Sequence, residues 1–210
     1  MPEDTEPYQK EKIIVWDWSG VNLHHESQGI EPKITDSIQY HCIERLKAED
    51  YDIIYDDDYS GEIADIITIK KTDEKFSIQL YHLKYAKGGR VSREVENLYE
   101  VCGQAQKSIH WRFKECTEFF EHLLKRKTKS RNGKQCSRLA KGSEQDLLGF
   151  YSLAKRNELK VEFEIFIVQP SIPKMEATQE QLTLLGVTEN YLMEKARVKL
   201  AVIGSKNMSN

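Results

Sequence analysis

Two stretches rich in apolar residues, separated by one turn, form the clearest pattern in the chain. Residues 62–69 are mostly β-branched, residues 76–85 mix apolar and polar positions, and a Thr-Asp-Glu turn joins them. Both stretches are therefore predicted to be strands. Because side chains on a strand alternate between its two faces, His82 and Lys84 point the same way. If the strands pair as a hairpin, Asp65 on the first strand lies near that pair.

Helical spacing precedes and follows this predicted hairpin. A helix is expected to begin near Thr35 or Asp36, either of which can cap it. Its buried face consists of Ile38, Cys42 and Leu46, which recur every four residues. The apolar face of the later helix has spacings of three and four and comprises Leu98, Val101, Cys102, Ala105 and Ile109.

Further strands are predicted at 13–18, 52–55, 161–168 and 198–203, the third of them stopped by Pro170. Further helices are predicted at 116–124, 144–156, 178–185 and 188–197. Gly186 is expected to end the helix at 178–185, because glycine is a common residue just after a helix C-terminus. The mixture of strands and helices predicts an α/β fold.

Bulk composition limits the class of protein. The chain has 210 residues, which suits one domain, and 39% of them are apolar, which is enough for a core. It lacks the run of about 18 apolar residues that a membrane-spanning helix needs. None of the four cysteines forms a C-x-x-C pair, which favours a reducing compartment and a cytoplasmic protein without a structural zinc site.

A net charge of −3 conceals one strongly basic stretch. Residues 125–141 contain eight cations and no acid, with a turn at Asn132-Gly133. These cations are Lys125, Arg126, Lys127, Lys129, Arg131, Lys134, Arg138 and Lys141. Such a run is either a solvated loop or a surface that contacts phosphates. In the second case the first seven of these cations, from Lys125 to Arg138, are the candidate nucleic-acid contacts.

The predicted hairpin also carries candidate chemistry. Asp65 stands among isoleucines and alanine, where a carboxylate is costly unless it is paired or bound to a metal. An acid, a further group able to bind a metal and a lysine at one edge of a sheet could together hold a divalent cation and activate a water molecule.

This order of elements resembles the core of the PD-(D/E)XK, or restriction-endonuclease-like, nuclease superfamily. In that superfamily a helix precedes a hairpin that carries Asp and then (Glu or Gln)-x-Lys, and another helix follows. The resemblance covers roughly residues 35–112. The segments LYHLKY at 80–85 and LYEVCGQA at 98–105 are similar to nuclease modules found beside helicase domains in bacterial defence-type proteins.

The resemblance implies a restriction-endonuclease-like core, with a central mixed β-sheet flanked by helices, over residues 34–210. Residues 1–33 would then be an N-terminal extension with an edge strand. It further implies a nuclease that uses Mg²⁺ or Mn²⁺ and acts on DNA in preference to RNA, in antiviral defence or DNA processing. A helicase would be its partner or part of its parent chain.

The residues that match the superfamily pattern receive their expected roles from it. Asp65 would hold the metal, and Lys84 would stabilise charge on the phosphate and help to position the attacking water. His82 stands where the superfamily has Glu or Gln, so it belongs to the candidate catalytic set. Gln104 matches a glutamine on the following helix, which would orient the lysine or a phosphate.

His82 is also the departure from the pattern, because an imidazole supplies no negative charge for Mg²⁺. Glu62, Glu44 on the first helix, or the carbonyl of Leu83 could compensate as metal ligands. Otherwise the site is inactive, and the chain is a module that binds nucleic acid or a helicase partner. A third possibility is a structural interaction domain with no role on nucleic acid.

Overall fold

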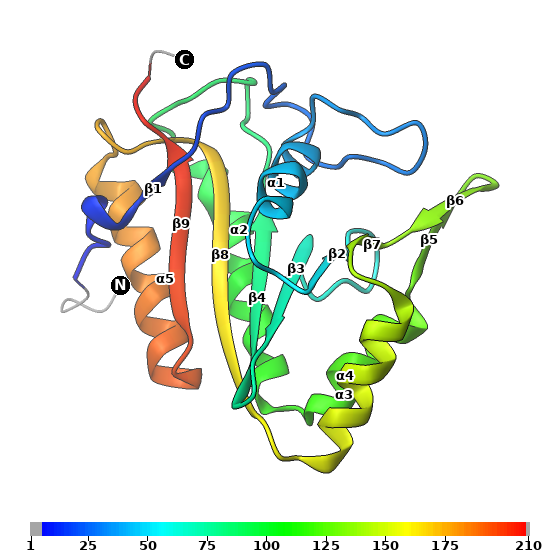
Figure 1. Ribbon diagram of the computed structural model, residues 1–210. Helices are drawn as coiled ribbons and strands as arrows, with labels where there is room; N and C mark the ends of the chain where they lie inside the picture. Colours follow the sequence, from blue (N-terminus) through cyan, green and yellow to red (C-terminus); the bar gives the residue numbers. More distant parts are fainter. Residues whose placement is uncertain (1–5, 209–210) are drawn as a thin grey trace.

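A central mixed β-sheet of seven strands organises residues 6–208, the part of the chain that this computed structural model describes (Figure 1). In spatial order the strands are β1 (Ile14–Val15), β9 (Lys199–Ser205), β8 (Lys160–Pro173), β4 (Lys75–Leu83), β3 (Ile66–Lys71), β2 (Ile53–Asp56) and β7 (Leu139–Lys141). The strands from β1 to β4 run parallel, whereas β3, β2 and β7 pair antiparallel. The predicted α/β class with a mixed sheet is confirmed.

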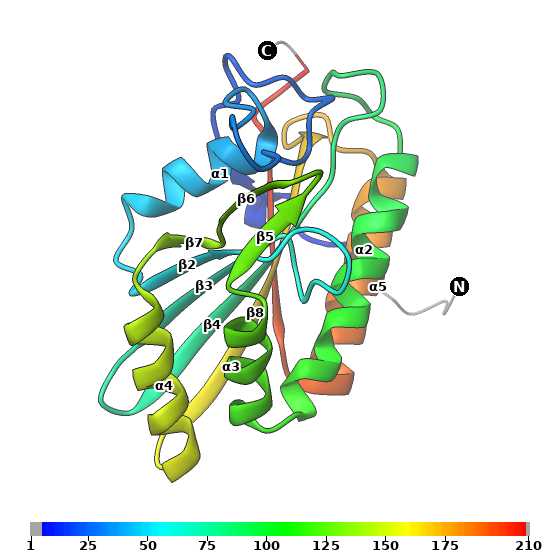
Figure 2. The same ribbon diagram turned by 90° about the vertical axis from the view of Figure 1, so that its right-hand side faces the viewer.

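Helices cover both faces of the sheet (Figure 2). One core lies between the sheet and α2 (Glu96–Ser108), α3 (Cys116–Lys125), α4 (Glu144–Arg156) and α5 (Gln179–Ala196). The other core lies under α1 (Ile38–Lys47). Two 3-10 turns, η1 (Lys10–Lys12) and η2 (Ile109–Phe113), complete the helical elements among residues 6–208.

The predicted helix faces match the buried ones. In α1, Ile38, Cys42 and Leu46 are buried beneath the helix. The five apolar residues predicted for the later helix are buried as well, four of them in α2 and Ile109 in η2. The cap of α1 is Ser37, whose hydroxyl accepts from the N–H of Tyr40. Ser37 therefore does what was expected of Thr35 or Asp36.

Two expectations for the C-terminal part were wrong. α5 is one continuous helix through Gly186, where a Cβ would lie 2.3 Å from the carbonyl oxygen of Glu6. Glycine is needed there because the N-terminal segment crosses the helix closely. Strand β8 continues past Pro170 to Pro173, and its pairing with β9 shifts register over this stretch instead of ending.

The N-terminal segment is part of the same core and not an appendage. Tyr8 and Ile13 are buried in the main core, and Trp18 donates from Nε1 to the carbonyl of Gly204 at 3.1 Å. Strand β1 pairs with β9 at the edge of the sheet, as the sequence suggested. Residues 1–5 of the expected extension and residues 209–210 lie outside the described residues.

Candidate active site

Asp65 is held at the start of β3 by a bond to the end of β4. Strands β3 and β4 pair antiparallel, with Ile66 opposite Tyr81, so the predicted hairpin is present. The N–H of Leu83 donates to Asp65 Oδ2 at 2.8 Å. The carboxylate therefore lies at the same edge of the sheet as Lys84, the next residue after Leu83.

Three carboxylates lie close together where β3 begins and β4 ends. Oxygens of Asp58, Glu62 and Asp65 lie within 4.8 Å of one another, and we refer to these three residues as the acidic group. Partial burial, followed by the charges of Asp58 and Asp57, raises the pKa of Glu62 to about 7. Burial and then the charge of Glu62 raise the pKa of Asp65 well above its usual range. The protein neighbours of the acidic group therefore do not fully stabilise the ionised forms of Glu62 and Asp65.

Lys84 lies between two further acids. Its Nζ is 2.9 Å from Glu100 on α2 and 3.3 Å from Glu26 in the loop before α1. Burial lowers the pKa of Lys84, but hydrogen bonds and charges from Glu100 and Glu26 outweigh this effect and the net pKa is raised. The ammonium is therefore charged and oriented, and its side chain is only 12% exposed.

Sequence reasoning missed Glu26. Its Oε2 accepts from the N–H of Tyr85 at 2.9 Å, and burial raises its pKa. The charge of Glu26 also acts on Glu62 and Asp65. Glu26 lies in a stretch without hydrophobic periodicity, and only the folded chain brings it to the end of β4, so the sequence held no signal for it.

His82 does not take the role expected of it. Its side chain is enclosed between the sheet and α2, with 3% exposure, and Nε2 lies 3.0 Å from Ser108 Oγ. Burial lowers the pKa of His82 to about 3, so the imidazole is neutral. The structure thus places His82 as a packing residue with one hydrogen-bond partner, which disfavours its assignment as a catalytic group.

Glu44 and Gln104 differ in how well they fit their expected roles. Glu44 projects from α1 into solvent, pairs with Lys47 at 2.6 Å and is not part of the acidic group, which disfavours its expected role as a metal ligand. Gln104 lies one turn after Glu100 on α2. Its Oε1 is buried and has no hydrogen-bond partner among residues 6–208. That unsatisfied oxygen leaves Gln104 as a candidate for contact with a ligand.

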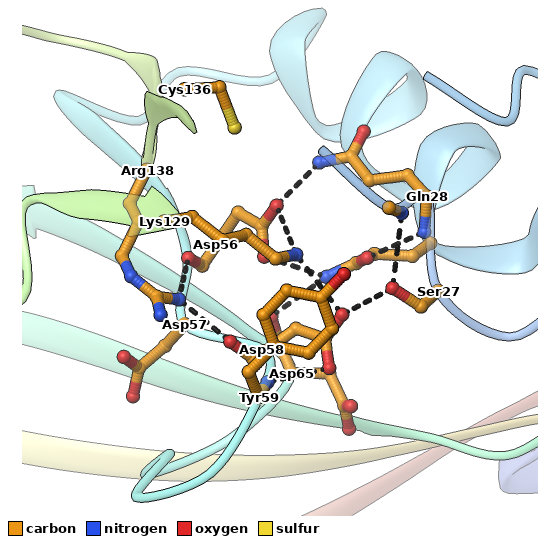
Figure 3. Close-up of polar contacts among 12 residues, drawn as sticks. Ser27, Gln28, Asp56, Asp57, Asp58, Tyr59, Asp65, Lys129, Cys136 and Arg138 are labelled. Carbon is orange, nitrogen blue, oxygen red and sulfur yellow. Dashed lines mark hydrogen bonds and ion pairs between the residues drawn. The ribbon is translucent and has the colours of Figure 1, made fainter. Parts of the chain in front are cut away.

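A buried ion-pair network holds Asp58 of the acidic group in place (Figure 3). Lys129, fully buried, donates from Nζ to both oxygens of Asp56 at 3.0 Å and to Asp58 Oδ2 at 3.1 Å. Ser27 also donates to Asp58 Oδ2, and Gln28 donates to Asp56. These donors fix the orientation of Asp58, so its side chain is preorganised beside Glu62 and Asp65.

The predicted phosphate-binding run 125–141 is mostly engaged with acids of the protein itself. It forms the hairpin of β5 (Thr128–Arg131) and β6 (Lys134–Ser137), which projects from the body of the molecule, and then β7 at the edge of the central sheet (Figure 1). Arg126 pairs with Asp57 at 2.7 Å, Lys125 with Glu121 at 3.3 Å, and Lys127 with Glu144.

Arg138 is buried and donates to the carbonyls of Asp56 and Asp58. Only Arg131 and Lys134 of the seven predicted contact residues are exposed without an ion pair to residues 6–208. The structure therefore disfavours run 125–141 as a phosphate-contacting surface, because acids pair with four of its cations and Arg138 is buried.

Comparisons with known proteins found no relative of this chain. No family model, curated protein or solved structure matches the chain. Among the helices of residues 6–208, none has the length and apolar character to cross a membrane. The arrangement of acids and lysine at the end of the β3–β4 hairpin is thus the feature on which a function must be argued.

Proposed function

We propose that this chain is a metal-dependent nuclease that hydrolyses phosphodiester bonds, with DNA preferred to RNA. The observation that carries the proposal is the acidic group, whose Asp65 accepts a hydrogen bond from the residue before Lys84. Carboxylates that bind a hard cation, next to an ammonium that binds phosphate, are the parts that phosphoryl chemistry needs.

The donor set fits Mg²⁺ or Mn²⁺. All three side chains of the acidic group offer carboxylate oxygens, which are the ligands that these cations prefer. The raised pKa values of Glu62 and Asp65 reflect burial and mutual repulsion, both of which a bound cation offsets. A divalent cation held there would make a water molecule more acidic and neutralise charge on the scissile phosphate.

Lys84 would bind the phosphate, with Glu26 and Glu100 as positioning residues. A fixed ammonium stabilises the negative charge that develops on the phosphate oxygens. Because Glu26 and Glu100 hold Nζ from two sides, the ammonium stays charged and needs little reorganisation. Gln104, one turn from Glu100, would offer its unsatisfied Oε1 to a water or to a donor group on the substrate.

The resemblance to the PD-(D/E)XK superfamily supports this proposal. The helix α1, the β3–β4 hairpin and the helix α2 follow in the order of that superfamily, with Asp65 and Lys84 at the corresponding positions. His82 departs from the pattern, but Glu62 and Asp58 supply acids beside Asp65. By the same resemblance we infer a role in DNA processing or antiviral defence, with a helicase as partner or parent chain.

Cleavage of labelled DNA and RNA, single- and double-stranded, tests the proposal. We expect cleavage with Mg²⁺ or Mn²⁺, none with EDTA, and loss of at least about a hundredfold in Asp65→Asn, since the metal would lose a charged ligand. Glu44→Gln is the matched control, because Glu44 is an acid outside the acidic group. Equal cleavage by Asp65→Asn and the wild-type protein would refute this site.

The alternative candidate is an inactive module of the same fold that binds nucleic acid or a helicase. The burial of His82 favours it, because the position of the superfamily's usual Glu or Gln offers no ligand. Under this alternative the wild-type protein would bind DNA but cleave none of the substrates with either metal. Binding without cleavage would therefore replace the nuclease proposal with the binding module.

A further inference from the structure

The loop between β4 and α2 carries the cations that the basic run 125–141 was expected to supply. From Lys84 to Arg93 the sequence contains four cations and no acid. Lys87, Arg90 and Arg93 are exposed, and none forms an ion pair with another residue of 6–208. Exposed cations that form no ion pair, this close in sequence to Lys84, are available to an anionic partner.

The backbone of this loop is fixed, so its cations have defined positions. Three main-chain N–H groups donate hydrogen bonds: that of Ala86 to the carbonyl of Leu23 at 2.8 Å, that of Lys87 to Asn97 Oδ1 at 2.9 Å, and that of Ser92 to the carbonyl of Ser171 at 2.9 Å. Ala86, Val91 and Ser92 are buried. The loop is therefore anchored at both ends and presents the side chains between its anchors outward.

Two glycines shape the turn at the outer end of the loop. Gly88 and Gly89 have φ values of 79° and 64°, a conformation that other residues rarely adopt. A Cβ on Gly89 would lie 2.3 Å from the ring of His24. The turn is thus packed against the N-terminal segment that also supplies Glu26 (Figure 2).

Exposed aromatic rings flank the ion pair of Lys84 and Glu100. Tyr85 follows Lys84 and is 41% exposed, and Tyr99 precedes Glu100 and is 60% exposed. Lys84 Nζ and Glu100 Oε1 are 2.9 Å apart, and each tyrosine is the sequence neighbour of one member of this ion pair. Lys84 Nζ lies 4.9 Å from the ring centroid of Tyr85, so cation and ring already share one surface.

We propose that the β4–α2 loop binds single-stranded nucleic acid, with Lys87, Arg90 and Arg93 on the phosphates and Tyr85 and Tyr99 stacked on unpaired bases. Cations interleaved with exposed rings are typical of single-strand surfaces, because only unpaired bases expose their faces for stacking. Glu94 and Glu96, which line a hollow with Lys87 and Arg90, bound this surface at its α2 end. This inference rests on the proposed function and adds the strandedness of the substrate.

Binding of fluorescein-labelled oligothymidine, and of its duplex with oligoadenine, tests the inference in EDTA, where no cleavage occurs. The wild-type protein should bind the single strand more tightly than the duplex. Changing Lys87, Arg90 and Arg93 together to Gln should weaken single-strand binding and make the salt slope shallower by about 0.7 for each lost phosphate contact. The matched control changes Lys125, Arg131 and Lys134 to Gln and should have little effect.

Tyr85→Ala tests stacking separately from charge. Single-strand affinity should fall roughly tenfold, whereas Tyr85→Phe, which keeps the ring, should retain the wild-type value. Circular dichroism of each variant checks the fold. Unchanged affinity in the loop triple variant, or duplex bound as tightly as the single strand, overturns the inference. Metal-dependent cleavage by the wild-type protein would then leave the proposed function standing.

Discussion

The main-chain N–H of Leu83 donates to Asp65 Oδ2 at 2.8 Å, which ties the acid at the start of β3 to the residue before Lys84. This bond lies next to the β3–β4 pairing and sets the position of the Asp65 carboxylate. Because rigid strands hold both ends, Asp65 and Lys84 keep their relationship even where the surrounding loops rearrange.

Lys129 is predicted to be a stability residue and not a phosphate contact. Lys129→Met leaves the buried Asp56 and the half-buried Asp58 without their ammonium partner, so we expect a loss of about 3–5 kcal/mol in unfolding free energy. Lys134→Met, on the exposed face of the same hairpin, should change it by less than about 0.5 kcal/mol. Urea unfolding of both variants measures the difference, and similar losses would contradict the buried network.

Metal affinity is predicted to depend on pH through Glu62. Its pKa rises from 4.5 to about 7 on folding, so its favourable contribution to stability is present below pH 4.5 and is lost as pH rises through 7. A metal requires the ionised form, so affinity should increase with pH and binding should release protons below about pH 7. Calorimetric Mn²⁺ titration in two buffers of different ionisation enthalpy counts those protons.

The same titration has an internal control. Glu62→Gln should weaken Mn²⁺ binding and reduce proton release, whereas Glu44→Gln should leave both unchanged because Glu44 is exposed on α1. A heat of binding that does not depend on the buffer in the wild-type protein near pH 6 would rule out Glu62 as the titrating ligand.

Replacing His82 with an acid is predicted to destabilise the fold instead of repairing the site. His82→Glu would bury a carboxylate against Ser108, and burial would raise its pKa. A raised carboxyl pKa means that the stability of this variant should fall as pH rises. His110→Glu, at an exposed position, is the control. Thermal unfolding across pH separates them, and a variant as stable as the wild type at alkaline pH would show that this pocket opens to solvent.

Lys84 should matter for cleavage far more than for folding. Its ion pairs with Glu26 and Glu100 are partly solvated, so Lys84→Met should change the unfolding free energy by about 1 kcal/mol or less. We expect it to reduce the single-turnover cleavage rate by at least about a hundredfold. Lys141→Met serves as the comparison, because the Lys141 ammonium donates to the backbone carbonyls of Lys47 and Glu49. A variant that cleaves at the wild-type rate would place the chemistry elsewhere.

Local periodicity was enough to predict most elements, but not the features set by distant parts of the chain. The faces of α1 and α2 and the β3–β4 hairpin followed from spacing, because each has one buried side. The prediction that Gly186 ends a helix was wrong. Glycine is required there because the carbonyl of Glu6 lies against the helix, and not because the helix ends. No local pattern reports such a crossing.

The residues of the candidate site also differ in whether the local sequence could predict them. Asp65 and Lys84 were predictable because strand alternation and one turn bring them together. Glu26 was not predictable because it comes from an aperiodic loop. Lys129 was not predictable because nothing in its local sequence distinguishes it from the other cations of its run. A charged run shows its total charge, but only the folded chain shows which acids neutralise it.

Diffraction from crystals soaked in Mn²⁺ tests the metal centre most directly. Anomalous scattering should place one ion between the carboxylates of Glu62 and Asp65, at the oxygen distances of about 2.0–2.3 Å usual for such cations, and beside Lys84. The ion should be absent from Asp65→Asn crystals soaked in the same way. Mn²⁺ bound elsewhere in the wild-type crystals, with no density at the acidic group, would contradict the metal-dependent mechanism proposed for this chain.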